Sequence, residues 1–159
     1  MPIPHVVVAV LSDEDLDALP PLVDEFVSTH RSLRFREAYW SALREWRGQR
    51  LQDEDTLALT AKVGGTLVGF ALATIQDHGP LLAPERIGYV SLLVVARESR
   101  RTGVGGALWK GLHAWFWAKG IRDIELYTEV GNERSTAFWE RRGFTPFLER
   151  RRRHLTGEP

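Results

Sequence analysis

The amino-acid sequence predicts an α/β (α+β) fold, a mixed and mostly antiparallel sheet with helices on both of its faces. Gly64 and Gly65 separate two strand-like runs as a two-residue hairpin does, and a hairpin joins antiparallel strands. A nearly continuous apolar run over 87–95 is typical of a central strand that is buried on both sides. The strands beyond it alternate with helical patterns, and helix crossovers join parallel strands. The sheet is therefore expected to be mixed.

The first half of the chain is expected to supply a strand, two helices and the hairpin. Val6–Val10 is a short β-branched run, and Ser12 followed by acidic residues is a helix-start signal. Pro20 and Pro21 then interrupt the pattern, so a new helical segment should begin with proline near its first turn. The expected elements are a strand over 6–10, a helical turn from 12, helices over 22–30 and 35–47, and strands over 57–63 and 66–75.

The second half alternates strands with helices. Gly-Pro and Ala-Pro pairs mark 77–86 as a loop. Two helical patterns stop at Gly120 and Gly143, since a helix commonly ends at a left-handed glycine. The expected elements are a strand over 87–95, a helix over 102–119, a strand over 124–130, a helix over 132–142 and a last strand over 144–149. The complete order is then β-αα-β-β-β-α-β-α-β.

Length and composition narrow the class of protein. The 159 residues have the usual size of one domain, and no repeat or linker divides them, so a single domain over 1–159 is expected. Lys plus Arg and Asp plus Glu are both 21, so no overall field favours nucleic acid, and no nucleic-acid partner is expected. Cysteine is absent, which excludes disulfides and thiol catalysis. Without a membrane-spanning run or a secretory signal pattern, a cytoplasmic location away from the membrane is expected.

The most informative segment joins the strand over 87–95 to the helix after it. Gly103 and Gly105 stand one residue apart where that helix begins. The first N–H groups of a helix have no intrahelical acceptor, and with the helix dipole they form an anion site. Glycine lets the backbone approach phosphate oxygens closely, and Arg100 and Arg101 add charged donors. The pattern favours a diphosphate ligand over an ordinary glycine turn, although it lacks the Gly-Lys-Ser/Thr of a P-loop.

This segment resembles the signature of the GCN5-related N-acetyltransferase (GNAT) family. In the family an Arg or Gln is followed after two residues by Gly-x-Gly, and Arg100-Arg101-Thr102-Gly103-Val104-Gly105 matches that pattern. The run that begins with Asn132 and ends with Gly143-Phe144 is similar to the Asn-x-x-Ala helix of the family. The good match covers 87–147, and the expected order of elements agrees over nearly the whole chain.

The resemblance implies an enzyme that transfers acetyl directly from acetyl-CoA, its co-substrate, to a primary amine. It implies that the backbone of the strand before the loop pairs with the pantetheine arm, that the loop holds the pyrophosphate and that the Asn-x-x-Ala helix lines the arm. The cofactor-binding residues so implied are Leu93, Val94, Val95, Arg100, Arg101, Thr102, Gly103, Val104, Gly105, Gly106, Asn132, Phe138 and Arg141. Asn132 also suits a helix cap. No metal is expected, because the five histidines show no metal-ligand spacing.

The catalytic residues depart from the family pattern. Ser91 stands where many relatives carry a glutamate, and Trp139 stands where many carry a tyrosine acid. Neither replacement can perform the proton transfer of the residue it replaces. Glu129 and Tyr127, two apart on the strand expected over 124–130, are the nearest alternatives because such residues share a face. Ser91 can still orient a water that relays the proton, and a backbone N–H near Leu93 or Val94 can serve the oxyanion.

The acceptor is expected to enter between the first two helices and the loop over 77–86. Acidic and aromatic residues in these segments suit a cationic amine, and they are Glu37, Tyr39, Trp40, Asp77, His78 and His30. The departures at Ser91 and Trp139 leave open a non-catalytic acyl-CoA sensor or partner domain. The basic run over 150–153 is read as a solvated tail, with a nucleic-acid contact as the alternative. Dimers are common among members of the family, so a homodimer is one arrangement that the resemblance suggests.

Overall fold

The computed structural model describes residues 5–35, 41, 44–45, 48 and 53–157. The chain divides into two compact units, Met1–Tyr127 and Thr128–Pro159. The helix expected over 35–47 falls largely outside the described residues, as do the acceptor candidates Glu37, Tyr39 and Trp40. The single-domain organisation stays a prediction.

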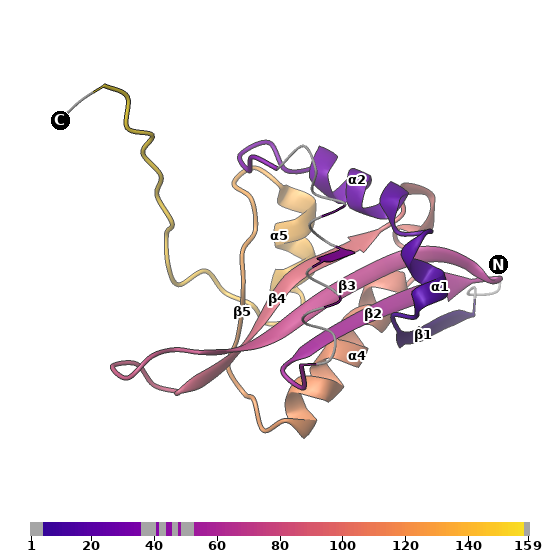
Figure 1. Ribbon diagram of the computed structural model, residues 1–159, viewed down its shortest axis with the longest axis horizontal. Helices are drawn as coiled ribbons and strands as arrows, with labels where there is room; N and C mark the ends of the chain where they lie inside the picture. Colours follow the sequence, from indigo (N-terminus) through magenta and orange to yellow (C-terminus); the bar gives the residue numbers. More distant parts are fainter. Residues whose placement is uncertain (1–4, 36–40, 42–43, 46–47, 49–52, 158–159) are drawn as a thin grey trace. The chain divides into compact units, whose positions relative to one another are not determined.

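Within the described part of the first unit, five strands form one sheet in the order in which they occur along the chain (Figure 1). Every neighbouring pair is antiparallel except the last, which is parallel. The sheet is thus mixed and mostly antiparallel, which confirms the predicted fold class. The strands are β1 (Val6–Val10), β2 (Thr56–Val63), β3 (Thr66–Asp77), β4 (Arg86–Val95) and β5 (Ile124–Leu126).

The hairpin between β2 and β3 has the predicted geometry. Val63 pairs with Thr66, so Gly64 and Gly65 alone make the turn. Their φ angles are 56° and 80°, and a type I′ turn requires positive φ at both central residues. Glycine adopts this conformation without steric strain, which is why the Gly-Gly pair predicts the turn so well.

Helices α1 (Asp13–Leu16) and α2 (Pro20–Ser28) cover one face of the sheet. Pro20 and Pro21 occupy the first turn of α2, where the missing N–H groups would have no intrahelical acceptor, so α2 begins before the expected residue Leu22. Leu22 and Val23 of α2 are buried in one apolar cluster with Phe70 of β3. This cluster places α2 above the central strands.

Helix α4 (Val104–Ala118) packs on the opposite face through a single apolar stripe. Val104, Leu108, Leu112 and Phe116 recur at every fourth position and are at most 1% exposed. Residues four apart lie on one side of a helix, so the stripe faces the sheet. Gly88 of β4 lies beneath Phe116, and this small residue allows close contact. The predicted arrangement with helices on both faces is therefore confirmed for the first unit (Figure 1).

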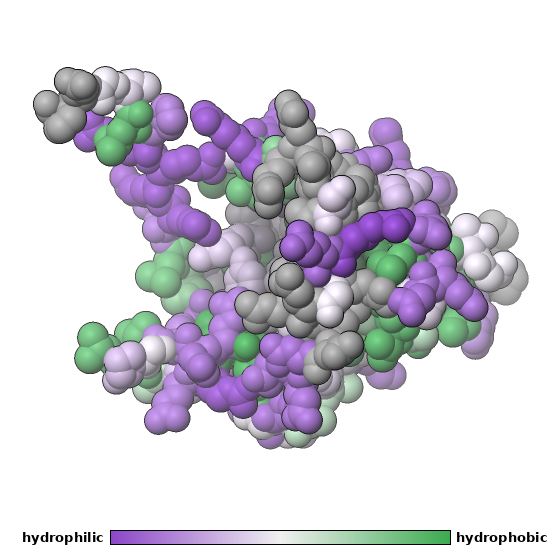
Figure 2. Space-filling model, viewed as in Figure 1, coloured by the Kyte–Doolittle hydropathy of each residue, from purple (hydrophilic) through white to green (hydrophobic). Residues whose placement is uncertain are grey.

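The second unit contains helix α5 (Glu133–Glu140) and an irregular C-terminal segment. The last strand expected over 144–149 does not form, since 144–156 has neither helix nor strand. Phe147 and Leu148 are 65% and 81% exposed, and Figure 2 shows mostly hydrophilic side chains along the rest of this segment. A strand needs a hydrogen-bonded neighbour, and Pro146 has no N–H to offer one. The apolar spacing predicted a strand here, but the segment lacks the hydrogen bonds to a neighbouring strand in the described part of the chain.

Candidate functional site

β4 carries a bulge at Ser91. Leu72 of β3 pairs with Leu92, whereas the next residue, Ala73, pairs with Val90, so Ser91 has no partner in the ladder. A bulge bends a strand and re-aims the residues that follow it. The Ser91 side chain is exposed. The serine that replaces the glutamate of many relatives therefore lies where β4 changes direction.

Beyond the bulge, one edge of β4 has no strand beside it in the described part of the chain. The ladder with β5 ends at Val90, whereas pairing with β3 continues to Val95. Ala96 donates its N–H to a carbonyl of β3, and peptide groups alternate sides along a strand. The N–H and C=O groups of Leu93 and Val95 therefore point away from β3, and those of Val94 point into the β3 ladder. The open edge offers the N–H and C=O of Leu93 and the N–H of Val95, whose C=O accepts the Nε of Arg100.

The loop after β4 reaches α4 through two residues in the left-handed conformation. The chain first makes the 3-10 turn η1 (Arg97–Ser99). Arg101 then has a φ of 61° and Gly103 a φ of 93°. Glycine adopts such angles freely, whereas the left-handed conformation costs a residue such as arginine about 1–2 kcal/mol. Thr102 donates its hydroxyl to the carbonyl of Ser99 at 2.6 Å and closes the turn. A strained residue that its surroundings hold in place is a mark of a functional loop.

The loop and the first turn of α4 carry a run of backbone donors. Among the residues that the structure describes, none accepts the backbone N–H groups of 101–106. The first bond of the helix runs from the N–H of Ala107 to the carbonyl of Gly103 at 2.9 Å. Because the positive end of the helix dipole lies at the same place, these donors form a site for an anion. These donors lie where a diphosphate was predicted from Gly103 and Gly105, and the diphosphate itself stays a prediction.

The two arginines of the loop have different surroundings. The Nε of Arg100 donates to the carbonyl of Val95 at 3.1 Å, and its guanidinium forms an ion pair with Glu25 of α2. The Arg101 side chain is exposed. Sequence reasoning treated both arginines alike and missed Glu25, because the pair joins residues 75 positions apart and no local pattern indicates it.

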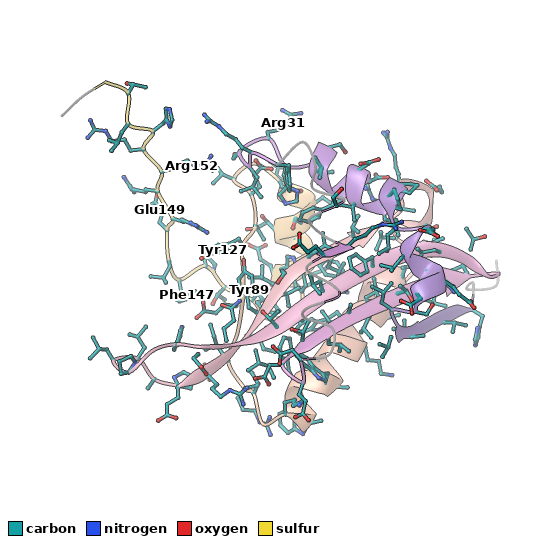
Figure 3. All side chains as sticks on the ribbon, viewed as in Figure 1. Arg31, Tyr89, Tyr127, Phe147, Glu149 and Arg152 are labelled. Carbon is teal, nitrogen blue, oxygen red and sulfur yellow. The ribbon has the colours of Figure 1, made fainter. Side chains whose placement is uncertain are left out.

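An aromatic and acidic cluster lies where β4 and β5 still pair. Tyr89 pairs with Glu125 in the parallel ladder, and Tyr127 follows Glu125 by two positions. The rings of Tyr89 and Tyr127 meet edge to face with centroids 5.7 Å apart, and Figure 3 shows the two side chains together. His78, in the connection after β3, places Nε2 3.5 Å from the Glu125 carboxylate. Glu125 was not predicted, although its spacing to Tyr127 would have placed both on one face.

The predicted proton-transfer residues lie at the end of β5 and after it. Tyr127 is 63% exposed. β5 ends at Leu126, so the strand expected over 124–130 is too long, and Tyr127 and Glu129 do not lie together on a regular strand. The chain turns directly afterwards, since the N–H of Asn132 donates to the carbonyl of Glu129 at 3.0 Å. The expectation that a strand holds these two side chains on one face is therefore wrong.

The predicted residues of the second unit lie on α5. Asn132 caps the helix, because its Oδ1 accepts the N–H of Ser135 at 3.1 Å, which confirms the expected cap. Phe138 lies under the guanidinium of Arg142, 3.5 Å from the ring centroid. Arg141 is exposed at the end of the helix. Burial lowers the pKa of Arg142, and the charge of Arg141 lowers it further.

Trp139 is the buried residue of α5. Its side chain is 7% exposed, and its ring meets those of Phe138 and Phe144 edge to face, with centroids 4.9 Å and 5.2 Å away. An indole N–H is a donor only, so this residue offers no proton acceptor. The observed contacts are those of a packing residue.

The described residues contain no group of three or more histidine, aspartate or glutamate side chains able to hold a metal ion. None of the described helices combines the length and hydropathy that crossing a bilayer requires.

Comparison with a curated protein gives a partial match. N-alpha-acetyltransferase 30 of Schizosaccharomyces pombe (strain 972 / ATCC 24843) is 33% identical over 70 residues, which are 44% of this chain and 47% of that protein. The matched part thus spans about half the length of this relative.

Solved structures match nearly the whole chain. An aminoglycoside antibiotic 6′-N-acetyltransferase from Acinetobacter haemolyticus superposes with a TM-score of 0.75 at 16% identity, covering 96% of this chain and 99% of that one. An aminoglycoside N-acetyltransferase in complex with CoA superposes with a TM-score of 0.76 at 20% identity, covering 96% of this chain and 95% of that one. At such identities the likeness shows the fold.

The family resemblance found at the loop and at the Asn-x-x-Ala helix extends over most of the sequence. The model of the acetyltransferase (GNAT) family matches residues 19–144, a range that includes α2, all strands except β1, the loop of backbone donors and α5. The chain belongs to the acetyltransferase (GNAT) family.

Proposed function

We propose that this chain is an acetyl-CoA-dependent N-acetyltransferase that moves an acetyl group directly from the thioester to a primary amine of a small molecule or peptide. One observation carries the proposal. In the described part of the chain, β4 has no neighbouring strand on one edge beyond Val90, and the N–H groups of 101–106, a few residues later, have no protein acceptor. Acetyl-CoA combines an extended arm that contains amides with a diphosphate, so it suits both features in their order along the chain.

The open edge is suited to the pantetheine arm. Peptide groups on a free strand edge bind an extended ligand with amide groups as they would bind a further strand. Leu93 supplies its N–H and C=O and Val95 its N–H, since the C=O of Val95 accepts the Nε of Arg100. Val94 uses its own groups in the β3 ladder and buries its side chain in the core. We therefore propose that the backbone of Leu93 and Val95 binds the arm and that Val94 supports them from within the sheet.

The loop is suited to the diphosphate. Its N–H groups are not shared with protein acceptors in the described part of the chain, and Arg101 adds an exposed guanidinium. Gly103 keeps the approach open, since nothing lies within 4 Å of the position a Cβ would take there. We assign the diphosphate to Arg100, Arg101, Thr102, Gly103, Val104, Gly105 and Gly106. The cofactor-binding roles of Asn132, Phe138 and Arg141, which belong to the second unit, stay predictions.

The N–H of Leu93 is the donor that best suits the oxyanion of the transfer step. It lies on the open side of β4 just after the bulge at Ser91, and it belongs to the backbone, so no particular side chain is required. A well-aimed oxyanion donor contributes about 3–4 kcal/mol to catalysis. Leu93 is preferred to Val94 because the N–H of Val94 points into the sheet.

The chain must also remove a proton from the acceptor amine. A lysine-type amine has a pKa near 10.4, so its deprotonation at neutral pH costs on the order of 4–5 kcal/mol. We propose Glu129 as the proton acceptor, with Tyr127 as a second candidate and Ser91 orienting a water. Glu125 of β5 is a further carboxylate, with Nε2 of His78 3.5 Å away. Replacing Glu125 gives a matched comparison for Glu129.

Two classes of acceptor amine should be tested first. The curated relative is an N-alpha-acetyltransferase, and the two solved structures described above are aminoglycoside acetyltransferases. Both classes present a primary amine that is cationic in water. We propose that such an amine reaches the face of the sheet that α2 covers, near His30 and near the consecutive residues Asp77 and His78.

Thiol release from acetyl-CoA tests the proposal. The purified chain is mixed with acetyl-CoA and with peptides bearing a free N-terminus, aminoglycosides or polyamines, and free CoA thiol and the acetylated product are measured. The expected result is thiol release that depends on one amine class and matches the product in amount. Isothermal calorimetry with acetyl-CoA alone measures binding separately. Absence of both binding and turnover would contradict the proposal.

A second candidate function is an acyl-CoA-binding domain without catalysis. Ser91 and Trp139 favour it, because neither provides the proton transfer of the residue found in many relatives. This alternative predicts acetyl-CoA binding in calorimetry without thiol release above the rate of an enzyme-free control. The same two measurements therefore separate the candidates.

A further inference from the structure

The side chain of Arg100 makes one bond to β4 and one to α2. Its Nε donates to the carbonyl of Val95, the last residue of β4, and another nitrogen of the same guanidinium forms the ion pair with Glu25. The side chains of Arg100 and Glu25 are only 20% and 25% exposed. One side chain thus ties the end of the central strand to the helix above it.

Arg100 lies next to the loop of backbone donors, so its two bonds can fix the conformation of that loop. Arg100 directly precedes Arg101, the residue held at a positive φ, where the N–H groups without an acceptor among the described residues begin. A guanidinium is a rigid planar fork, so two bonds fix its orientation and the backbone next to it. A guanidinium committed to Val95 and Glu25 also has fewer donors left for a phosphate.

We propose that Glu25 is a positioning residue for the diphosphate loop. It acts through Arg100, whose side chain braces the loop, while the exposed Arg101 supplies the cationic contact. The inference rests on the proposed binding of acetyl-CoA at this loop. It assigns a role to a residue of α2 that lies outside the signature of the family.

Removal of Glu25 should change the affinity for acetyl-CoA in opposite directions, depending on whether Glu25 acts through its charge or by positioning Arg100. Removing a carboxylate beside the loop makes the site more positive, which by itself strengthens binding of a diphosphate. Removing a brace allows Arg100 and the backbone of 101–106 to leave the geometry that suits the ligand, which weakens binding. The direction of the change in affinity therefore decides between the two.

The central experiment titrates the intact chain and its variants with acetyl-CoA by calorimetry. Glu25→Ala is expected to raise the dissociation constant about tenfold, the loss of a hydrogen bond to a charged group. Glu25→Gln keeps an acceptor oxygen for Arg100 and should recover most of the affinity. Glu98→Ala is the matched control, because Glu98 is an exposed carboxylate of η1 and its removal changes only the charge. Tighter binding by Glu25→Ala would overturn the proposal.

A lysine substitution tests whether Arg100 acts by geometry or by charge. One ammonium cannot reproduce two bonds made in fixed directions, so Arg100→Lys should bind acetyl-CoA as weakly as Arg100→Ala. Arg101→Lys should lose less affinity than Arg100→Lys, because a phosphate accepts a point charge. Binding by Arg100→Lys equal to that of the unmodified chain would show that charge alone matters and would contradict the brace.

An acetyl donor without the diphosphate tests whether Glu25 acts on binding of that group. S-acetylpantetheine has the thioester and the arm but no diphosphate, so Glu25→Ala should raise the KM for acetyl-CoA while leaving kcat/KM for S-acetylpantetheine unchanged. An equal loss with both donors would mean a general structural defect and would overturn the proposal. Thermal unfolding without ligand confirms that each variant is folded. If the unmodified chain binds no acetyl-CoA, the proposed function itself fails, whereas normal binding with unaffected variants rejects only the role of Glu25.

Discussion

The ammonium of Lys62 lies 2.6 Å from a carboxylate oxygen of Asp15, a residue that is buried at the junction of α1 and β2. The other oxygen of Asp15 accepts hydrogen bonds from Ser12 at 3.0 Å and from Thr60 at 3.4 Å. Burial raises the pKa of Asp15, but the hydrogen bonds from Lys62 and Ser12 and the charge of Lys62 outweigh it. The pKa of Asp15 therefore lies below its ordinary value.

This lowered pKa makes stability depend on pH in a definite direction. The unfolded chain takes up the proton of Asp15 near pH 4, at a higher pH than the folded chain does. The stabilisation is therefore complete above about pH 4 and is lost as the pH falls through the pKa of the folded state. Asp15→Asn should lower the free energy of unfolding at pH 7 by about 1–3 kcal/mol, with a smaller difference at pH 3.

Urea unfolding at pH 7, 5 and 3 measures this effect. Glu14→Gln is the matched control, because Glu14 is the exposed neighbour of Asp15 on the same helix. The control should unfold like the unmodified chain at each pH. A destabilisation by Asp15→Asn that stays constant from pH 7 to pH 3 would show that the charge of Asp15 is not what stabilises the fold.

Gly88 is expected to tolerate no side chain. A Cβ there would lie 2.5 Å from Cε1 of Phe116, which is completely buried in the α4 stripe. Overpacking of a core costs about 1–3 kcal/mol, so Gly88→Ala should lower the melting temperature clearly. Adding Phe116→Leu to that variant should restore part of the loss. Gly48→Ala is the control, because nothing lies within 4 Å of the added Cβ.

Acetyl-CoA should raise the melting temperature of the unmodified chain, because a ligand bound only by the folded state stabilises it. Gly103→Val should remove this shift, since the added side chain obstructs the approach to the backbone donors. Valine at a φ of 93° is also strained, so the variant should melt lower without ligand. Gly120→Val, at a φ of 77° beyond the other end of α4, provides the control for strain alone. It should keep the full shift with acetyl-CoA, and loss of the shift in both variants would point to a damaged fold.

Local signals explain what the sequence predicted well. The Gly64-Gly65 turn, the end of α4 just before Gly120 and the Asn132 cap each depend on residues a few positions apart, and the structure confirms each of them. The loop before α4 was singled out for the same reason, since its glycines and arginines are contiguous, and its binding of a diphosphate stays a prediction. Such features follow from backbone conformation and helix periodicity, which a single sequence displays.

Features that depend on distant partners were missed or misjudged. The bulge at Ser91 arises from the register between β3 and β4, and no residue pattern marks it. The brace between Arg100 and Glu25 joins two elements that only the folded chain brings together. The strands expected over 124–130 and 144–149 were too long or absent, because strand length depends on a paired neighbour as well as on apolar spacing.

Trp139→Phe should separate stability from catalysis. Trp139 is buried between aromatic rings, so the smaller side chain leaves a void, and the melting temperature should fall by several degrees. The indole is not a usable acid near neutral pH, so kcat/KM for acetyl transfer should remain within about threefold of the unmodified value. Thiol-release kinetics measured well below the melting temperature check this. A drop of about a hundredfold or more in kcat/KM would make Trp139 part of the chemistry.

The dependence of kcat/KM on pH tests which proton transfer limits the reaction. Without a tyrosine at the position of Trp139, thiolate must leave directly or take a proton through water, and a thiol is acidic enough for this. Deprotonation of the amine is then the step under pH control, so kcat/KM should rise with pH along a single limb. Glu129→Gln should lower kcat/KM by about 10²–10⁴ and Glu125→Gln by much less, if Glu129 is the base. A bell-shaped profile whose alkaline limb disappears in Tyr127→Phe would instead make Tyr127 the acid that protonates the departing thiolate.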